Sequence, residues 1–485
     1  MASAKIAGHR LNCHSMGIGA QTADVCVVGA GPAGSVIATR LAQLGHDVCL
    51  IERSGFPRRH LGESLSAGVL PMLETTGARG AVESAGFSRV RSVLTNWSGA
   101  LDERVDAREQ GMLVDRGRFD EILAHHACAE GVRVLQPARI SSRARTERGW
   151  LLTVDSGQRS FPLSARFLVD ATGRRAMLPG HRRATGPRTI ALYAYWRGRS
   201  LPDRPRIEAG AHEWYWGVPL PDGSYNTLVF VDGESLRRHG QSTQARFREL
   251  IAHSGLLEHA HDAEMVGPML ACDATPYLDE ESVTAASLKV GDSALAIDPL
   301  SSSGVQKAIQ SALSGAVVAN TLLRRPESAH TAMQFYRESL SYASERHRGW
   351  AAAHYSTVEA RSPSTFWTTR SRGAVVHATP PTGAIGARIA SKAPVAVSPH
   401  LEIVSVPRLG SEFVGLGSAL RHPALDAPIA YLGGWELAPL LRDVRPGMTP
   451  LQIVQAWSAR VPFKSGITIA GWLLGHDILV PHSPT

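Results

Sequence analysis

Three glycines spaced as Gly29-x-Gly31-x-x-Gly34 follow the apolar run Val25–Val28 and precede an alanine-rich run. In this spacing the first glycine permits a tight turn, the second lets the backbone approach a pyrophosphate, and the third lets a helix pack closely on a strand. The N-terminus of that helix presents unpaired N–H groups to an anion. The chemistry expected here is binding of a dinucleotide through its phosphates.

Glu52 extends this pattern, because it ends a second apolar strand 18 residues beyond Gly34. A carboxylate at that place can accept hydrogen bonds from an adenosine ribose. A bare glycine triplet could be an ordinary turn. Strand, glycine turn, helix, second strand and acid in this order predict a dinucleotide-binding βαβ unit.

Four later segments place polar residues between predicted elements. Arg53-S-G-F-P-R-R-H-L-G-E-S-Leu65 leads into an expected helix, Leu65–Leu73. Val114-D-R-G-R-F-D-E-I-L-A-H-H-Ala127 reads as a helix led by Arg116, and Phe167-L-V-D-A-T-G-Arg174 as a strand and turn. The last, Lys289-V-G-D-S-A-L-A-I-D-P-L-S-S-S-G-V-Q-K-A-I-Gln310, reads as a strand ending at Gly291-Asp292, a turn at Pro299, and a helix opening at Ser303-Gly304.

Together with the glycine motif, these segments resemble the FAD-dependent hydroxylase and halogenase superfamily. The resemblance implies an α/β fold with a Rossmann-like FAD-binding domain and FAD as the cofactor. It places Asp292 at the ribityl or pyrophosphate region, the Ser303-Gly304 helix start facing the isoalloxazine ring, and Arg116 reaching the FAD. The residues it implies for FAD binding are Gly29, Gly31, Gly34, Glu52, Arg53, Gly62, Glu63, Ser64, Arg116, Gly291, Asp292, Gly304 and Val305.

Composition bounds the class of protein. The chain has 485 residues, 44% of them hydrophobic and 19% charged, which suits a globular enzyme of two to four domains rather than a disordered chain. No apolar run reaches the roughly 18 residues of a membrane span. Residues 1–23 lack the apolar core of a secretory signal and are expected to be a loose leader. We expect no membrane association.

Charge and cysteine usage further limit the expected partners, location and metal sites of the protein. The formal net charge is +8, yet no basic run interleaved with aromatic residues is present, so nucleic acid is not an expected partner. The five cysteines form no C-x-x-C pair, which predicts a reducing, cytoplasmic location and no zinc site. His259-A-H-Asp262 has metal-like letters, but lies in a polar helical stretch and is read as solvated surface.

The domain organisation is expected to be discontinuous. Residues 24–180 and 280–345 would form the FAD-binding domain, and 181–279 a β-rich substrate domain layered over the flavin. Residues 346–424 read as a helical and irregular connection, with 362–412 rich in Pro, Ser, Gly and Ala. Residues 425–485 hold short helical runs and a strand, with Thr449 as N-cap before Pro450. They resemble a winged-helix module of the peptide-binding kind, with a plain structural cap or a dimer contact as the alternative.

A tryptophan-rich segment bears on the catalytic chemistry. His212-E-W-Y-W-G-V-Pro219 resembles the W-x-W-x-I-P signature of flavin-dependent halogenases. Core packing of paired indoles is the plainer alternative. Halogenation also needs a lysine amine, and no lysine occurs between Lys5 and Lys289. The closest matching position is Val90, between two arginines, and guanidinium is not a nucleophile. Ser301 also replaces the glutamate of the P-L-E-S-T-G turn of tryptophan halogenases.

The same architecture without that lysine fits a monooxygenase. The resemblance to flavin monooxygenases implies that reduced FAD and O2 form a C4a-hydroperoxide, which an electron-rich aromatic ring attacks. The protein would orient that ring and exclude water. The electron donor would be NAD(P)H or separately supplied reduced flavin. The expected catalytic residues are Trp214 and Trp216 lining the chamber, Pro299 and Ser303 at the flavin's reactive edge, and His60 as a proton-transfer candidate.

The substrate is expected to be a tryptophan side chain in a peptide or protein. Ser301-S-S-G-V-Q-K-A-I-Q-S-A-Leu313 with W-Y-W-G-V-P-L-P-D-G most resembles tryptophan-halogenase-like flavoproteins that hydroxylate peptidyl tryptophan, of the kind that matures quinohemoprotein amine dehydrogenase in cysteine tryptophylquinone biogenesis. Peptide-carrier or maturation proteins would then be partners. A halogenase, an FAD-dependent reductase of the same fold, and a non-enzymatic peptide-binding escort are the alternatives.

Overall fold

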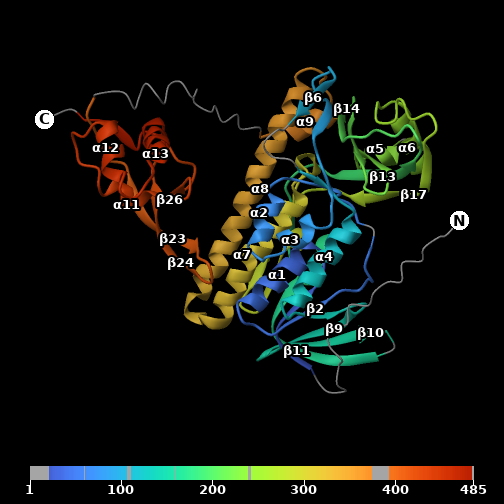
Figure 1. The fold of residues 1–485 in the computed structure, drawn as a ribbon, viewed down its shortest axis with the longest axis horizontal. Coiled ribbons are helices and arrows are strands. Elements are labelled where there is room, and N and C mark those ends of the chain that lie inside the picture. Colours follow the sequence, from blue (N-terminus) through green and yellow to red (C-terminus); the bar gives the residue numbers. More distant parts are fainter. Residues whose placement is uncertain are drawn as a thin grey trace. The chain divides into compact units, whose positions relative to one another are not determined.

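The computed structural model describes residues 21–58, 60–105, 111–157, 159–238, 242–373 and 393–482. The chain divides into two compact units. The first comprises Met1–Val375 with Ser411–Phe413, and the second comprises Val376–Gly410 with Val414–Thr485. Figure 1 labels their helices and strands, with the second unit in orange and red.

A parallel sheet forms the centre of the first unit. Its strands β1 (Gln21–Val28), β2 (Val48–Ile51), β8 (Arg133–Leu135), β11 (Arg159–Asp170) and β20 (Ser287–Lys289) lie in the order β20-β11-β1-β2-β8. Every pairing between these five strands is parallel. The last four residues of β1 and all of β2 are buried, as expected for parallel strands covered on both faces. The predicted Rossmann-like α/β class is confirmed.

Three helices position the site against this sheet. α1 (Pro32–Gln43) packs against both α7 (Gly304–Arg324) and α4 (Arg116–Ala129), as can be followed in Figure 1. α4 begins at Arg116 and α7 at Gly304, as predicted. The N-cap of α4 is Asp115, whose carboxylate accepts the backbone N–H of Arg118, a capping bond that helices favour.

The first unit contains a second sheet of seven strands. Its order is β17-β13-β16-β15-β14-β5-β6, with β13 (Thr189–Arg197), β14 (Arg206–Ala209), β15 (Glu213–Pro219), β16 (Tyr225–Asp232) and β17 (Glu264–Asp273) from the predicted insert. β5 (Ser92–Asn96) and β6 (Asp102–Val105) come from earlier in the chain, and β5 pairs parallel with β14. The β-rich layer therefore extends beyond residues 181–279.

The second sheet has two different faces, as strand alternation requires. One carries Leu192, Tyr215 and Val229 and is packed with α6 (Thr243–Ala252). The other carries Trp214 and Phe230 and packs with residues of α8 (Ala329–Glu359) and α9 (Thr365–Ser371). Leu61 and Leu300 also contact this second face, so it faces the predicted cofactor loops.

A small sheet holds the Gly62-Glu63-Ser64 loop. β3 (Ser64–Leu65) and β4 (Ser88–Arg89) both pair with β7 (Met112–Leu113). The expected helix Leu65–Leu73 is therefore wrong at its start, and α2 runs over Val69–Glu74. Leu65 pairs with Met112 across β3 and β7, and this strand pairing overrides the local helical pattern.

The remaining elements of the first unit connect these layers. β10 (Gly149–Ser156) pairs antiparallel with β9 (Arg139–Thr146) and β11. The others are α3 (Arg79–Glu83), β12 (Arg182–Ala184), α5 (Ser235–Arg238), β18 (Tyr277–Asp279), β19 (Val283–Thr284), β21 (Leu295–Ala296) and four short 3₁₀ turns, Gly173–Arg175, Gly291–Ser293, Pro299–Ser301 and Pro326–Ser328.

The second unit has its own core. Its elements are β22 (Val395–Val397), β23 (Glu402–Leu409), β24 (Val414–Arg421), β25 (Tyr431–Leu432), β26 (Trp435–Glu436), α11 (Leu437–Leu441), α12 (Pro450–Trp457), α13 (Phe463–Gly475) and β27 (Leu479–Pro481). Thr449 is the N-cap of α12, as predicted, and it also forms a reciprocal capping box with Gln452. Leu420 and Trp457 are both fully buried in one cluster.

The interval 346–424 is more regular than expected. α8 continues to Glu359, and α9 and the β23–β24 hairpin fall inside the segment read as irregular; residues 374–392 of it lie outside the described residues. The compact C-terminal unit begins before residue 425, because β22 pairs with β27 and Val395 belongs to the same core as the helices. These long-range contacts leave no local signal in a Pro- and Gly-rich sequence.

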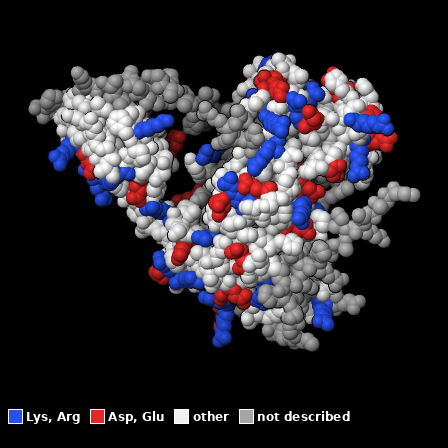
Figure 2. All heavy atoms as spheres, in the orientation of Figure 1, with Lys and Arg blue, Asp and Glu red and all other residues white. Residues whose placement is uncertain are grey.

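On the face drawn in Figure 2, acidic and basic side chains are interspersed among the described residues. No helix in the described part of the chain is long and apolar enough to cross a membrane.

Cys26, Cys49 and Cys272 are free thiols, whereas Cys128 at the end of α4 is disulfide-bonded. The cysteine pattern did not predict this disulfide.

Candidate active site

The glycine turn has the geometry its spacing predicts. Gly29 adopts φ +100°, and a Cβ there would lie 2.5 Å from the Ala171 carbonyl oxygen. A Cβ on Gly34 would lie 1.7 Å from the Gly29 oxygen, so α1 packs directly on the end of β1. A Cβ on Gly31 would meet only an Arg58 guanidinium nitrogen at 3.7 Å. The space at Gly31 is therefore open to a ligand backbone or phosphate.

Glu52 folds back onto this turn. Its carboxylate accepts the backbone N–H of Ala30 at 2.9 Å and that of Ser54 at 3.0 Å. The Arg58 guanidinium lies 3.7 Å from Glu52 and 3.4 Å from the buried carboxylate of Asp120 on α4. Arg58 and Asp120 were not predicted as site residues, although Arg58 lies in the F-P-R-R-H part of the Arg53–Leu65 segment that resembles flavin-binding proteins.

Asp292 sits in a charged group beside the turn of Gly291. Its carboxylate is 2.7 Å from the Lys307 ammonium and 3.9 Å from the Arg174 guanidinium, and 39% of its side chain is exposed. Burial raises the pKa of Asp292, but the Lys307 and Arg174 cations outweigh it, so the pKa lies below its usual range. His60 is close enough to lower that pKa further. Lys307 was not predicted.

The Gly62–Ser64 loop is clamped from α4. The Arg116 guanidinium donates to the Leu61 carbonyl at 2.5 Å and to both carboxylate oxygens of Asp120. A Cβ on Gly62, whose φ is +101°, would lie 2.6 Å from Arg116. Arg116 is therefore buried against the loop, and its predicted reach to the cofactor stays a prediction.

The start of α7 meets the same loop. Pro299–Ser301 forms a 3₁₀ turn, Ser302 takes a left-handed conformation, and Ser303 is the N-cap of α7. Gly304 is exposed with open space where a Cβ would be. The side chain of Val305 lies 3.8 Å from the Cβ position of Gly62, so two segments far apart in sequence meet here.

The predicted cofactor residues therefore converge from four segments. The Cβ position of Gly291 lies 3.0 Å from Ala33 on α1, which joins the second turn to the glycine motif. Open Cβ positions at Gly31 and Gly304, with helix N-termini behind both, fit an elongated ligand with an anionic part. These residues fit FAD. That Gly31 holds its phosphates and Gly304 faces its ring system stays a prediction.

His60 lies on the rim of this group. It is exposed, and its Nδ1 is 2.9 Å from the Leu61 carbonyl. Surrounding protein and the Arg116 cation lower the pKa of His60, which favours the neutral ring at neutral pH. A proton-transfer role for His60 stays a prediction.

The aromatic face of the second sheet is ordered by strand register into three rows. Ala191, Phe230 and Trp214 lie side by side, as do Tyr193, Leu228 and Trp216, and then Tyr195, Asn226 and Val218. All three rows point to the face that contacts the cofactor loops. The substrate chamber that the sequence predicts between this face and those loops stays a prediction.

The first row is closed by packing. Trp214 is 2% exposed and stacks on Phe230, with ring centroids 3.7 Å apart and planes 10° from parallel. Trp97 packs edge-on against Trp214, and Trp367 packs edge-on against Trp97. Trp214 therefore belongs to an aromatic core, which is the plainer reading of paired indoles, whereas half-buried Trp216 and Tyr193 in the second row offer surface to a ligand.

Asp298, which precedes the Pro299 turn, is tied to the aromatic core. Its carboxylate accepts the Tyr355 hydroxyl at 2.8 Å and the Leu300 N–H at 3.0 Å. Burial raises the pKa of Asp298. No motif predicted this pair, because Tyr355 lies 57 residues away from Asp298.

The position matching the halogenase lysine carries no amine. Val90 donates its backbone N–H to Gly111, and the neighbouring Arg89 is exposed and paired with Glu83. Among the described residues of the first unit, the lysines are Lys289 and Lys307. Each is bound at 2.7 Å to a carboxylate, of Asp279 and Asp292 respectively.

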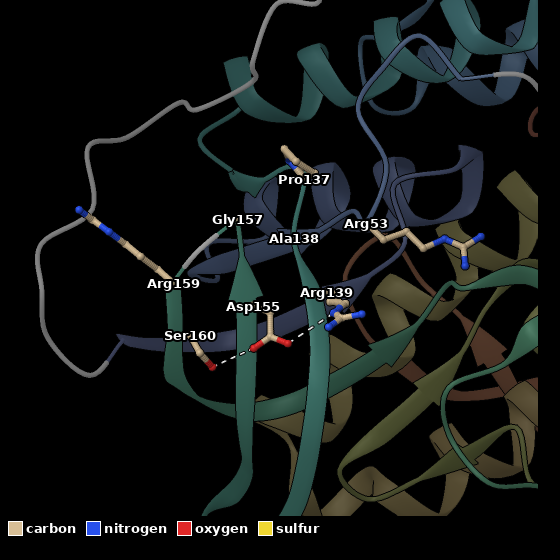
Figure 3. A pocket seen from close by; sticks show the side chains of 8 residues that line it. All are labelled: Arg53, Pro137, Ala138, Arg139, Asp155, Gly157, Arg159 and Ser160. Carbon is tan, nitrogen blue, oxygen red and sulfur yellow. Dashed lines mark hydrogen bonds and ion pairs between the residues drawn. The ribbon is translucent and has the colours of Figure 1, made fainter.

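Arg53 lies apart from the converging residues. It is exposed and borders a surface hollow of about 340 Å³ over β9, β10 and the start of β11. Figure 3 shows Arg53 and Arg159 pointing away from each other, while Asp155 at the centre is bonded to Arg139 and Ser160. These arginines do not converge on a common ligand position. The described residues also contain no group of three or more His, Cys, Asp or Glu side chains able to hold a metal.

Comparisons with known proteins agree with this geometry. Residues 24–179 match the family model described as FAD dependent oxidoreductase. The tryptophan 2-halogenase of Chondromyces crocatus is 32% identical over 371 residues, which cover 71% of this chain and 70% of that protein. The flavin-dependent halogenase CmlS has a similar fold, with a TM-score of 0.78 and 20% identity over 96% of both chains.

A further solved structure is the peptidyl tryptophan dihydroxylase QhpG, described as essential for tryptophylquinone cofactor biogenesis. It is 28% identical, with a TM-score of 0.69, and covers 94% of this chain and 99% of that one. The match of family model, relatives and fold confirms the resemblance seen in the sequence. The chain is a flavoenzyme and belongs to the FAD-dependent oxidoreductases that include the flavin-dependent halogenases.

Proposed function

We propose that this flavoenzyme is a monooxygenase that hydroxylates an electron-rich aromatic ring, with a tryptophan side chain in a peptide or protein as its substrate. The proposal rests on the positions and ion pairs of the described lysines of the first unit. Halogen transfer needs an unpaired amine beside the substrate, but Val90 occupies the matching position. Lys289 and Lys307 are both committed to buried or half-buried carboxylates.

One solved relative supports a peptide substrate. The peptidyl tryptophan dihydroxylase is 28% identical over 94% of this chain, whereas the halogenase CmlS, which covers 96% of it, is 20% identical. Binding of a small free aromatic molecule would not require a separate C-terminal unit with its own apolar core. We propose that this unit holds the polypeptide that carries the tryptophan, including one borne by a carrier or maturation protein.

Bound FAD would supply oxygen activation after reduction by NAD(P)H or by a separate flavin reductase. The residues of the chain bind the cofactor, orient the substrate ring and exclude water. Gly29–Gly34, Asp292 and the start of α7 hold the cofactor, and the half-buried second row orients the ring. The closed aromatic core around Trp214 excludes water from one side of the chamber.

The proposal is tested by product mass. Purified holoenzyme is given reduced FAD, air and a tryptophan-bearing peptide, with and without chloride or bromide. We expect one or two oxygen atoms in the product, derived from isotopically heavy O2, and no dependence on halide. Trp216→Ala should lower product formed per O2 consumed, because an unoriented ring lets the oxidant decay to H2O2. A matched control is Trp350→Ala, an exposed tryptophan of α8.

A second candidate is a flavin-dependent halogenase. The 32% identity to a tryptophan 2-halogenase and the W-x-W-x-V-P segment favour it. The same experiment separates the two functions. A product that gains chlorine or bromine, appears only with halide, and contains no heavy oxygen would replace the monooxygenase proposal with this one.

A further inference from the structure

Carboxylates tie two of the predicted cofactor segments to neighbouring layers of the first unit. Glu63 accepts the Tyr195 hydroxyl of the second sheet at 3.0 Å. Asp298, which precedes the Pro299 turn, accepts the Tyr355 hydroxyl of α8 at 2.8 Å. The second of these ties bears directly on the start of α7, because Asp298 also bonds the turn that leads into that helix.

The Asp298 carboxylate joins the turn to α8 through a single atom. Its Oδ1 accepts both the Tyr355 hydroxyl at 2.8 Å and the Leu300 backbone N–H at 3.0 Å. Asp298 thereby caps the 3₁₀ turn Pro299–Ser301. A tyrosine hydroxyl has one proton to donate, and Tyr355 donates it to this oxygen. The turn is therefore fastened to α8 by a hydrogen-bonded chain of two side chains.

The turn needs such support, because it ends in a backbone conformation that residues with a side chain disfavour. Ser302 has φ +49°, in the left-handed region. Residues of this kind persist only where surrounding contacts hold them. The Ser302 N–H donates to the Pro299 carbonyl at 3.1 Å, and the Ser303 hydroxyl donates to the Ser301 carbonyl at 3.0 Å. These bonds close the turn on itself and do not attach it to the rest of the fold.

The aromatic core makes Tyr355 a rigid anchor for the turn. Tyr355 is 2% exposed, and its ring centroid lies 6.2 Å from that of Trp97 and 5.8 Å from that of Trp367. Leu300 is buried in the same core. The turn is thus attached at two points, by a hydrogen bond to the Asp298 carboxylate and by the apolar packing of Leu300.

We propose that Tyr355 and Asp298 are positioning residues: the Tyr355 hydroxyl holds the Asp298 carboxylate, and that carboxylate fixes the turn between Pro299 and Ser303. Through this turn the pair sets the start of α7 at Gly304, where the flavin ring is predicted to lie. Neither residue makes or breaks a bond. The inference goes beyond the proposed function, because a turn at the flavin has to be fixed for oxygen transfer and for halogen transfer alike.

The first test measures hydrogen–deuterium exchange of the full-length, FAD-loaded enzyme by mass spectrometry. Tyr355→Phe keeps the ring, so the aromatic core stays filled while the donor to Asp298 is lost. We expect the segment 298–304 to exchange at least about 10-fold faster, because opening of the turn no longer breaks a hydrogen bond to a carboxylate. Unchanged exchange in this segment would overturn the inference.

Tyr336→Phe is the matched control for this measurement. Tyr336 is a second fully buried tyrosine of α8, and its hydroxyl donates to the Lys289 carbonyl at 2.7 Å. It lies roughly 28 Å from Tyr355 along the helix, so the segment 298–304 should exchange as in wild type. If Tyr355→Phe speeds exchange throughout α8 and the aromatic core equally, its role is packing, and the inference is contradicted.

Two substitutions at Asp298 separate its acceptor atom from its charge. Asparagine keeps a side-chain oxygen that can accept both hydrogen bonds, whereas alanine keeps none. Asp298→Ala should therefore match Tyr355→Phe in exchange, and Asp298→Asn should stay close to wild type. If Asp298→Asn behaves like Asp298→Ala, hydrogen bonding at this oxygen does not hold the turn, and the inference fails.

The bound flavin provides a second, spectroscopic measurement. Its visible absorbance and circular dichroism should change in Tyr355→Phe and Asp298→Ala, because both variants release the turn that is predicted to face the ring. The spectra should stay unchanged in Tyr336→Phe and Asp298→Asn. One and the same flavin spectrum in all four variants would contradict the placement of the start of α7 by this pair.

The exchange and flavin measurements use no substrate, so their results are independent of the proposed function. An enzyme that halogenates its peptide but shows the expected exchange and spectra keeps the positioning pair and loses the monooxygenase proposal. An enzyme that oxygenates the peptide but shows unchanged exchange in Tyr355→Phe keeps the proposed function and loses the positioning pair.

Discussion

Lys307→Met removes the cation nearest to Asp292 while keeping a long side chain in its place. Removing one partner of a fully buried ion pair costs roughly 3–5 kcal/mol. Lys307 is 4% exposed, but the Asp292 side chain keeps 39% exposure, so water screens the uncompensated carboxylate. Discounting by about half for that screening leaves a cost of about 2 kcal/mol.

Two measurements check that figure. Urea denaturation of the apoprotein should show a free energy of unfolding lower by about 2 kcal/mol. Titration of flavin fluorescence should show an FAD dissociation constant raised roughly 10-fold, because an uncompensated carboxylate repels an anionic cofactor. Lys464→Met, which removes an exposed lysine from α13, is the control.

The pH dependence has a defined sign. The pKa of Asp292 is lowered in the folded protein, so its contribution is present above the ordinary aspartate value and is lost as pH falls through the lower folded value. Without Lys307 the folded pKa rises and the loss begins at a higher pH. Should Lys307→Met match Lys464→Met in unfolding, FAD affinity and acid sensitivity, the coupling of Lys307 to the cofactor site is refuted.

Three further substitutions test the packing. Gly34→Ala should abolish tight FAD binding, measured by flavin retention on gel filtration, because its Cβ would lie 1.7 Å from the Gly29 oxygen; full flavin occupancy would contradict this. Trp214→Ala should lower the free energy of unfolding by roughly 3–5 kcal/mol in urea, the cost of emptying a packed core, and a loss below about 1 kcal/mol would show the site is not packed. Lys289→Met should cost a similar 3–5 kcal/mol, since both Lys289 and Asp279 are at most 2% exposed, and an unchanged midpoint would argue against an ionised pair.

The sequence determined the cofactor end of the molecule because its demands are local. The glycine spacing, the strands around it and the helix start at Gly304 each depend on neighbours within a turn or a strand. A positive φ at Gly29 and a close contact at Gly34 restrict those positions to glycine whatever surrounds them. Motif reasoning therefore found this part of the fold and its flavin chemistry.

Tertiary structure decided the rest, because the contacts concerned join distant segments. Neither the pairing of β5 with β14 nor the stacking of Trp214 on Phe230 can be read from spacing along the chain. Glu63 looks like a loop residue of the cofactor motif, and only the folded second sheet brings Tyr195 to it, 132 residues away. Burial and partner then set the charge and hydrogen-bonding role of such a side chain, which a linear sequence does not specify.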